Sequence, residues 1–416
     1  MHILILHQYF LEKDGGGGSR FNEMAELWSQ AGHQVTVISG MVHYNTGLKK
    51  PEYKGKLFYI EDYAPGVRVI RCHVSESYNK SFIGRLWGYF SFTFWGTMGG
   101  LLKAKDRYDI ILSTSPPLFI GISAFILSRL KRIPFVFEVR DLWPESAIDT
   151  GVLTNGLIIK LSFWLEKWIY KKARLINVLT PAFRKTLIEQ KKVDPKKVLY
   201  IPNAADFRLS DRLLSDFDPA SFRSEHMLPD DKLILTYVGA HGRANNLEQV
   251  LRAAGQLRDK PVLFLLIGAG MEKPMLMEEA KKQHLDNILF IDPVPKKEVF
   301  RYIMASDVGI SVLKKVDTFK TIYSNKTFDY MSCQKPVLMV IDGVSRELVE
   351  EAKCGKYAEP ENTTAFVEAV NYFLLHKEQL REMGENGYEF AKTHFDRSKL
   401  AGRYIAEIET KLNGNG

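Results

Sequence analysis

Short apolar runs of strand length alternate with helical segments along this sequence, in two successive series. The first series of predicted strands is Ile3–Leu6, Gln34–Ser39, Val67–Cys72, Ile110–Ser113, Phe135–Val139, Leu175–Leu179 and Val198–Ile201. The second is Leu233–Val238, Val262–Ile267, Ile288–Phe290, Val308–Val312 and Val337–Val340, with helices predicted at Asn246–Leu257, Glu272–Gln283, Lys297–Ala305 and Thr363–His376. This alternation predicts an α/β fold with two doubly wound, Rossmann-like domains.

A polar gap separates the two series, and 416 residues are too many for a single core. We interpret the Asp- and Ser-rich stretch 208–231 as a linker or an irregular insertion. The predicted domains are residues 1–205 and 206–395, and a final segment, 396–416, whose helix packs back on the N-terminal domain. The carboxyl ends of the strands are expected to face a cleft between the domains, where ligands bind.

The balance of charge points to a phosphate-bearing partner. Lys and Arg number 57 against 49 Asp and Glu, which gives a net charge of +8. The basic residues are scattered and no aromatic–basic recognition motif occurs, which argues against nucleic acid. Three distant cysteines, without a C-x-x-C pair, predict a reduced, cytosolic chain without disulfides or zinc. The opening MHILIL is too short for a signal peptide.

A run of four glycines, residues 15–18, lies between the first predicted strand and an amphipathic stretch that starts at Phe21. Ser19 is a candidate N-cap for that helix. Glycines here let the backbone approach a ligand closely, and the free N–H groups of a helix start favour an anion. The spacing is not G-x-G-x-x-G, and a plain flexible loop would have the same composition.

Ten stretches carry a family resemblance, in order along nearly the whole chain. They are HQYF…GGGGSR, TSPPLFIG, FEVRDLWPES, VLTPAF, IPNAAD, YVGAHGRANNLEQVL, LIGAGMEK, FIDPVPKKEV, ASDVGIS and SNKTFDYMSCQKPVL. With them the chain resembles family 4 glycosyltransferases of the GT-B fold. Within that family it is most similar to bacterial transferases of capsule, O-antigen and exopolysaccharide assembly, including N-acetylfucosamine transferases.

The resemblance implies a retaining sugar transfer from a nucleotide sugar, with the donor on the C-terminal domain and the acceptor mainly on the N-terminal one. A UDP-sugar is the expected donor, with N-acetylated sugars among the candidates. Arg243 and Lys326 are predicted to grip the diphosphate as it leaves, so no metal and no cofactor is expected. The donor-binding residues are then Gly16, Gly17, Gly18, His241, Gly268, Gly270, Val294 and Asp329. In the alternative, Arg243 and Lys326 are only solvated surface cations.

The chain departs from the family pattern at two positions. Many members carry a Glu-x7-Glu motif around the helix of SNKTFDYM, where this chain has Thr321 and Asp329. Asp329 can still accept hydrogen bonds from a ribose, whereas Thr321 cannot serve as a carboxylate. Many members also have a lysine shortly after the arginine, where this chain has Asn245 and Asn246.

FEVRDLWPES follows a predicted strand and supplies the expected acceptor side. Asp141 is the predicted catalytic residue, which would orient or deprotonate the acceptor hydroxyl. Arg140 and Glu145 are predicted to bind the acceptor, with Arg140 on a phosphate. Glu138 is a further nearby acid. The alternative is an internal Arg–Asp ion pair that only shapes the loop.

Two apolar segments, residues 81–102 and 157–175, suggest a membrane surface. The first has a single charge, and the second combines apolar residues along one face with five basic residues. Trp87, Trp95, Trp164 and Trp168 are the predicted membrane contacts. In the alternative, both segments pack on the N-terminal sheet.

The D-x-D triplet at Asp216 lies in the polar gap, so we interpret it as solvated rather than as a metal site, and the histidines have no metal spacing. The prediction is a cytoplasmic glycosyltransferase, peripheral on the inner face of the cell membrane, which transfers a sugar to a glycan on a lipid diphosphate. One rival is a GT-B enzyme with a soluble acceptor. Another is a basic, non-enzymatic protein that binds nucleic acid or an anionic surface.

Overall fold

A computed structural model describes residues 1–13, 20–43, 47–77 and 82–413. The chain divides into two compact units. Unit 1 contains Met1–Pro202 and Ser398–Gly416, and unit 2 contains Asn203–Arg397. Each unit has its own sheet, and no described strand is shared between the two sheets.

Unit 1 is built on an eight-stranded sheet in the order β3-β4-β2-β1-β5-β6-β7-β8. The strands are β1 His2–Leu6, β2 Gln34–Gly40, β3 Phe58–Ala64, β4 Val67–Cys72, β5 Ile110–Ser115, β6 Phe135–Val139, β7 Leu175–Val178 and β8 Val198–Tyr200. All neighbours are parallel except β3 and β4. The central strands are buried along their whole length, which explains why they have unbroken apolar runs.

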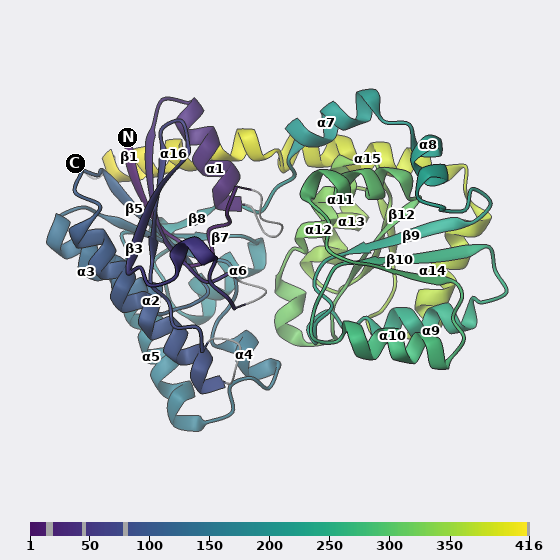
Figure 1. Ribbon diagram of the computed structural model, residues 1–416, viewed down its shortest axis with the longest axis horizontal. Coiled ribbons are helices and arrows are strands. Elements are labelled where there is room, and N and C mark those ends of the chain that lie inside the picture. The colour runs from purple at the N-terminus through teal and green to yellow at the C-terminus, as the bar shows by residue number, and fades with distance from the viewer. Residues whose placement is uncertain (14–19, 44–46, 78–81, 414–416) are drawn as a thin grey trace. The chain divides into compact units, whose positions relative to one another are not determined.

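Helices surround this sheet (Figure 1). They are α1 Arg20–Gln30, α2 Phe82–Leu102, α3 Ile120–Lys131, α4 Glu145–Asp149, α5 Gly156–Lys172, α6 Pro181–Lys185 and α16 Arg397–Asn413, with short turns of other helix types at Pro51–Tyr53, Thr186–Gln190 and Pro195–Lys197. The helix α16 packs on α1: the indole N–H of Trp28 donates to the carbonyl of Ala401 at 2.8 Å, and the Trp28 and Tyr404 rings meet edge to face. Residues after unit 2 therefore complete the core of unit 1.

Unit 2 has a six-stranded parallel sheet in the order β11-β10-β9-β12-β13-β14. The strands are β9 Leu233–Val238, β10 Val262–Ile267, β11 Ile288–Ile291, β12 Val308–Val312, β13 Val337–Val340 and β14 Gly355–Tyr357. The helices are α7 Phe207–Asp216, α8 Pro219–Glu225, α9 Glu248–Gln256, α10 Lys273–Lys282, α11 Lys296–Ala305, α12 Asn325–Ser332, α13 Val344–Glu351, α14 Thr363–Leu375 and α15 Gln379–His394, and a 3-10 turn covers Asp317–Thr321. Both faces of the sheet are thus covered (Figure 1).

The stretch 208–231 is not an irregular linker, contrary to the sequence-based interpretation. It contains most of α7 and all of α8, and Phe222 is buried in the core of unit 2. Asp218, the last residue of the D-x-D triplet, accepts a hydrogen bond from the backbone N–H of Ala220 and so caps α8. The polar composition reflects exposed helix faces rather than a linker. Among the described helices, none is both long and apolar enough to cross a bilayer.

Candidate functional site

The strand order of unit 2 reverses between β9 and β12, because β9 pairs with β10 on one side and with β12 on the other. Loops after two such strands diverge to opposite faces, so a ligand can bind at their carboxyl ends. The two loops are joined here, since the backbone N–H of Lys314, after β12, donates to the carbonyl of Ala244, after β9. The switch point therefore defines the candidate site of unit 2.

Gly268 lets the loop after β10 pack directly on the loop after β9. Its φ of +147° is a conformation that side chains rarely adopt, and an added Cβ would lie 1.9 Å from the carbonyl oxygen of Gly239. The same crowding occurs at Gly270, where a Cβ would lie 2.2 Å from the carbonyl oxygen of His241. Both predicted donor-binding glycines thus fix the shape of the loops beside the switch point.

His241 is fully buried between these loops. Neither ring nitrogen has a hydrogen-bond partner in the described part of the chain. Burial, together with the nearby Lys273 ammonium group, lowers the pKa of His241 to about 4, so the ring is neutral. The Lys273 ammonium group itself donates to the carbonyls of Gly268 and Ile291, each at 2.9 Å, and so ties the ends of β10 and β11 together.

Arg243 follows β9 and its side chain is exposed. It forms no hydrogen bond or ion pair with any residue that the structure describes. All the donor groups of the guanidinium are thus available to an anion, as the sequence analysis predicts for a diphosphate ligand.

Lys326 lies in the first turn of α12 and is half-buried. Its Nζ is 4.9 Å from the centre of the Tyr237 ring, and its Cε would lie 3.3 Å from a Cβ added at Gly239. The lysine therefore reaches the end of β9. Burial lowers the pKa of Lys326 to about 8, although Asp329 one turn away opposes the shift.

The remaining predicted donor residues lie in different surroundings. Asp329 is half-buried on α12, and Val294, in the loop after β11, packs against an apolar cluster of unit 2. Thr321 donates to the carbonyl of Thr318 at 2.6 Å. Asn246 donates to Glu361 at 2.9 Å. The described residues do not include Gly16, Gly17, Gly18 or the candidate cap Ser19. The helix α1 begins at Arg20.

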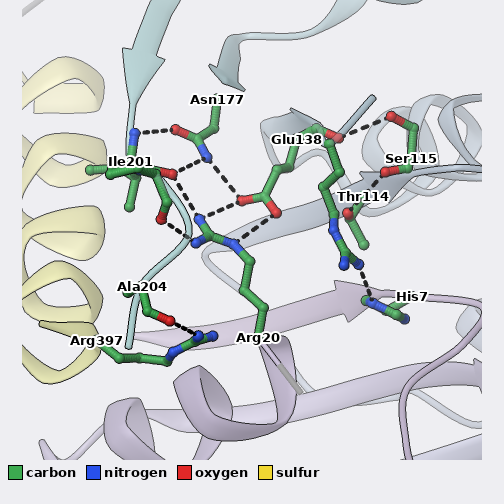
Figure 2. A network of polar contacts seen from close by, with 11 residues as sticks. His7, Arg20, Thr114, Ser115, Glu138, Asn177, Ile201, Ala204 and Arg397 are labelled. Atoms are coloured by element: carbon green, nitrogen blue, oxygen red, sulfur yellow. Dashed lines mark hydrogen bonds and ion pairs between the residues drawn. The ribbon is translucent and has the colours of Figure 1, made fainter. Parts of the chain in front are cut away.

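A buried ion pair joins α1 to β6 in unit 1 (Figure 2). The Arg20 guanidinium donates to both carboxylate oxygens of Glu138 at 3.1 Å and to the carbonyl of Ile201 at 2.9 Å. The Asn177 amide donates to the same carboxylate at 2.9 Å. Glu138 is thus occupied by internal partners and unsuited to act as an acceptor base. Sequence reasoning missed this pair, since the partners are 118 residues apart and only spatial proximity identifies them.

The other residues of FEVRDLWPES have separate partners. Arg140 Nη1 lies 3.1 Å from Nε2 of His7, which follows the carboxyl end of β1. Asp141 accepts a hydrogen bond of 2.8 Å from the Ser146 hydroxyl, and burial raises the pKa of Asp141. An acid with a raised pKa is a better proton acceptor than a solvated one.

Glu145 pairs with Lys191 at 2.5 Å. The same ammonium group binds the buried Glu166, which also accepts a hydrogen bond from Tyr170 at 2.9 Å. Burial raises the pKa of Glu166 to about 7. The structure thus brings Glu145 into an internal charge cluster that the sequence analysis did not foresee. Among the described residues, no group of His, Cys, Asp and Glu is arranged to hold a metal ion.

The four predicted membrane tryptophans fall into two classes. Trp87 on α2 and Trp164 on α5 are 61% and 64% exposed. Trp95 packs edge to face on Phe58, and Trp168 packs edge to face on Phe125. The first two are thus surface groups, whereas the second two contribute to packing within unit 1.

Two Rossmann-like units in one chain, each built on its own mostly parallel sheet, have the architecture of the GT-B fold class. Residues 15–204 match the model of a glycosyl transferase 4-like domain, and residues 219–390 match that of the glycosyl transferases group 1. The chain therefore belongs to the family 4 glycosyltransferases, and it is a GT-B glycosyltransferase.

Individual proteins agree with this assignment. A protein of Escherichia coli (strain K12), named as the colanic acid biosynthesis glycosyl transferase WcaI, is 23% identical over 98% of this chain and 100% of its own length. Sucrose-phosphate synthase from Thermosynechococcus elongatus shares the fold with a TM-score of 0.74 and 18% identity, over the full length of both chains. Anabaena Alr3699/HepE in complex with UDP-glucose gives a TM-score of 0.71 and 16% identity, over 99% of this chain and 100% of the other.

Proposed function

We propose that this glycosyltransferase moves a sugar from a UDP-sugar, with retention of configuration, to a glycan carried on a lipid diphosphate, in the assembly of a bacterial surface polysaccharide. The relative named for colanic acid biosynthesis supports the polysaccharide, and the neighbour solved with UDP-glucose supports the donor. An N-acetylated sugar is the variant of the donor to test first.

The observation that carries the proposal is the pair of cations at the switch point of unit 2. Arg243 follows β9 and is exposed and unpaired among the described residues, and the side chain of Lys326, on α12, reaches the end of the same strand. As the sugar leaves, negative charge grows on the diphosphate, and fixed cations stabilise that charge more in the transition state than in the ground state. Asp329 would hold the ribose hydroxyls, and no protein nucleophile is required.

The acceptor side rests on unit 1. Arg140 would bind an acceptor phosphate, and Asp141 would orient or deprotonate the acceptor hydroxyl. Glu145 is less suited than Asp141 to orient or deprotonate the acceptor hydroxyl, because its carboxylate is already paired with Lys191. A membrane role is supported by exposed apolar side chains on α5, Leu157, Leu161 and Trp164, beside exposed lysines at 160, 167 and 171.

A panel of nucleotide sugars with UDP, GDP and ADP as the nucleotide tests the donor. We expect slow hydrolysis of UDP-sugars without acceptor, sugar transfer with a lipid-diphosphate glycan, and retained activity in EDTA. Loss of activity in EDTA with recovery in Mg²⁺ or Mn²⁺ would refute the proposal that Arg243 and Lys326 stabilise the leaving diphosphate without a metal ion. If the protein turned over no nucleotide sugar, that result would favour the alternative of a basic, non-enzymatic protein that binds nucleic acid or an anionic surface.

Flotation with vesicles tests the acceptor class. Recovery of the protein with anionic vesicles would support a lipid-linked acceptor. A protein that stays in the soluble fraction and glycosylates a water-soluble glycan would instead be the soluble-acceptor enzyme.

A further inference from the structure

Lys191 joins three segments of unit 1. It follows the short turn Thr186–Gln190, and its backbone N–H donates to the carbonyl of Thr186 at 3.0 Å. Its ammonium group lies 2.5 Å from Oε1 of Glu145 on α4 and 2.5 Å from Oε1 of Glu166 on α5. The other carboxylate oxygen of Glu145 is buried and has no hydrogen-bond partner among the described residues. A single cation therefore ties α4 both to α5 and to the turn that follows α6.

The segment that Lys191 holds also carries Asp141. Glu145 is the first residue of α4, and the hydroxyl of the next residue, Ser146, donates to Asp141 at 2.8 Å. The backbone N–H of Ser146 donates to the carbonyl of Leu142 at 2.8 Å, so the chain makes a tight turn between Asp141 and α4. A displacement of Glu145 therefore moves the hydrogen-bond donor of Asp141.

The charges around Lys191 do not balance. One ammonium group faces the carboxyls of Glu145 and Glu166, and two carboxyls that share a site do not both ionise freely. Burial raises the pKa of Glu166 to about 7, an effect that Lys191 opposes and the Glu145 charge increases. Tyr170 donates to Glu166 at 2.9 Å. Burial raises the pKa of Tyr170, and the charges of these two acids and of Asp141 raise it further. The three acids are thus close to one hydroxyl and one cation.

We infer from these contacts that Lys191 is a positioning residue for the proposed transfer to the acceptor. Its bond to Glu145 keeps α4 in place, and α4 presents the Ser146 hydroxyl to Asp141. Its positive charge also offsets the charge of Glu145, which disfavours ionisation of Asp141. Glu166 competes for the same cation when it is ionised. The reaction served by Asp141 rests on the proposed function, whereas the charge cluster does not depend on it.

The first test titrates Asp141 directly. The full chain, labelled at its aspartate carboxyl carbons, is titrated by carbon NMR, and an Asp141→Asn protein identifies the Asp141 signal. We expect Lys191→Met to move the midpoint of this signal to higher pH, because the Glu145 charge is no longer offset. Arg140 acts on Asp141 in the opposite sense to Glu145 and is unchanged in this variant.

Two further proteins make this titration specific. Lys191→Arg should restore the midpoint, since a guanidinium can also bind two carboxylates. Lys192→Met is the matched control, because Lys192 is the next residue and is exposed. Glu145→Gln provides a second variant if Lys191→Met does not fold. It removes a negative charge beside Asp141, so it should move the midpoint to lower pH.

Kinetics tests the effect on transfer, with a UDP-sugar as donor and N-acetylglucosamine linked to farnesyl diphosphate as acceptor. Lys191→Met should lower kcat/KM for this acceptor on the order of tenfold, as for the loss of one charge-assisted hydrogen bond. The KM for the UDP-sugar should stay the same, because the predicted diphosphate-binding cations belong to unit 2.

The possible outcomes separate this inference from the proposed function. An unchanged Asp141 midpoint in the folded Lys191→Met and Glu145→Gln proteins would overturn the inference, and so would an unchanged kcat/KM in Lys191→Met. If the midpoint shifts as expected and the wild-type chain transfers no sugar to the farnesyl-linked acceptor, the charge cluster is supported and the proposed acceptor is refuted.

Discussion

Arg20 and Lys326 are both cations removed from water, and they are stabilised in different ways. Arg20 has a bidentate carboxylate partner and two backbone carbonyls, Ile201 and Pro202. Lys326 has no ion pair with a described residue, and burial lowers its pKa to about 8. A fully paired buried charge is a structural element, whereas a half-buried, unpaired charge is suited to a ligand.

Arg243→Ala should lower kcat on the order of 10²–10³-fold, which is about 2.7–4 kcal/mol, because its guanidinium is expected to stabilise charge that grows as the diphosphate leaves. Arg243→Lys should recover only part of the rate, since the bidentate geometry is lost. Steady-state kinetics with the active UDP-sugar measures both variants. Arg252→Ala, on the exposed face of α9, is the matched control. An Arg243→Ala enzyme with unchanged kcat contradicts the assignment.

The pH dependence of kcat/KM for the donor tests Lys326. Because burial lowers the pKa of Lys326 to about 8, its charge is present below that pH and is lost as the pH rises through it. We therefore expect kcat/KM to fall above about pH 8. Lys326→Arg, whose guanidinium stays charged, should abolish that fall. The same fall in both proteins would show that another group is titrating.

Glu138→Leu should destabilise unit 1 by about 3–5 kcal/mol, because it leaves the Arg20 charge buried without its carboxylate. The double variant Arg20→Met with Glu138→Leu should recover much of that loss, since no unpaired charge remains. Urea denaturation measures both. Arg381→Ala, from an exposed pair with Glu385, should cost at most about 1 kcal/mol. If the single and double variants were equally unstable, packing rather than charge would explain the loss.

At the scale of helices and strands, the sequence was most informative where burial is complete. The strand β6 was predicted with its observed bounds, because both of its faces are buried and its residues form one apolar run. The edge strand β3 was missed, since its exposed Ile60 and charged Glu61 disrupt that pattern, and β14 has only three residues. The helices α7 and α8 were missed because each buries few residues.

The positions of the candidate-site loops could be predicted from the ends of the predicted strands. The contacts between those loops could not be predicted. The sequence indicated the position of Arg243 and Lys326, because each follows or precedes a predicted element. It could not indicate that Lys191 neutralises Glu145 or that Arg20 occupies Glu138, since these partners are distant in the chain. Long-range pairing of charges depends on topology, which the local pattern of residues does not encode.

The helix α5 has an outer face that suits a membrane surface and an inner face that packs. Trp164→Ser should release the protein from anionic vesicles in a flotation assay, while its thermal stability and donor hydrolysis stay largely unchanged, because Trp164 is 64% exposed. Trp168→Ser should instead lower the thermal stability, since Trp168 packs on Phe125. Leu375→Ser, an exposed position of unit 2, is the control. Full vesicle binding by Trp164→Ser would exclude α5 as the contact.

At the scale of the whole molecule, unit 2 is continuous in sequence and unit 1 is not. A chain truncated after Arg397 lacks α16, so Trp28 loses its hydrogen bond to Ala401 and its contact with Tyr404. We expect the truncated chain to show a lower unfolding temperature for unit 1 and an unchanged one for unit 2 in calorimetry. A Trp28→Phe variant of the full chain should show a smaller decrease in the unfolding temperature of unit 1. Equal shifts of both transitions would mean that α16 stabilises the two units alike.

The discontinuity of unit 1 also sets the order in which a ribosome can produce the finished units. Domains generally fold as they emerge, the N-terminal one first. Here the segment that completes unit 1 is translated only after all of Asn203–Arg397, which at about 5–20 residues per second takes on the order of ten seconds or more. During that interval α16 has not yet packed on the α1 surface around Trp28, whereas all residues of unit 2 have been synthesised. The unit whose synthesis begins first is thus the one that is completed last.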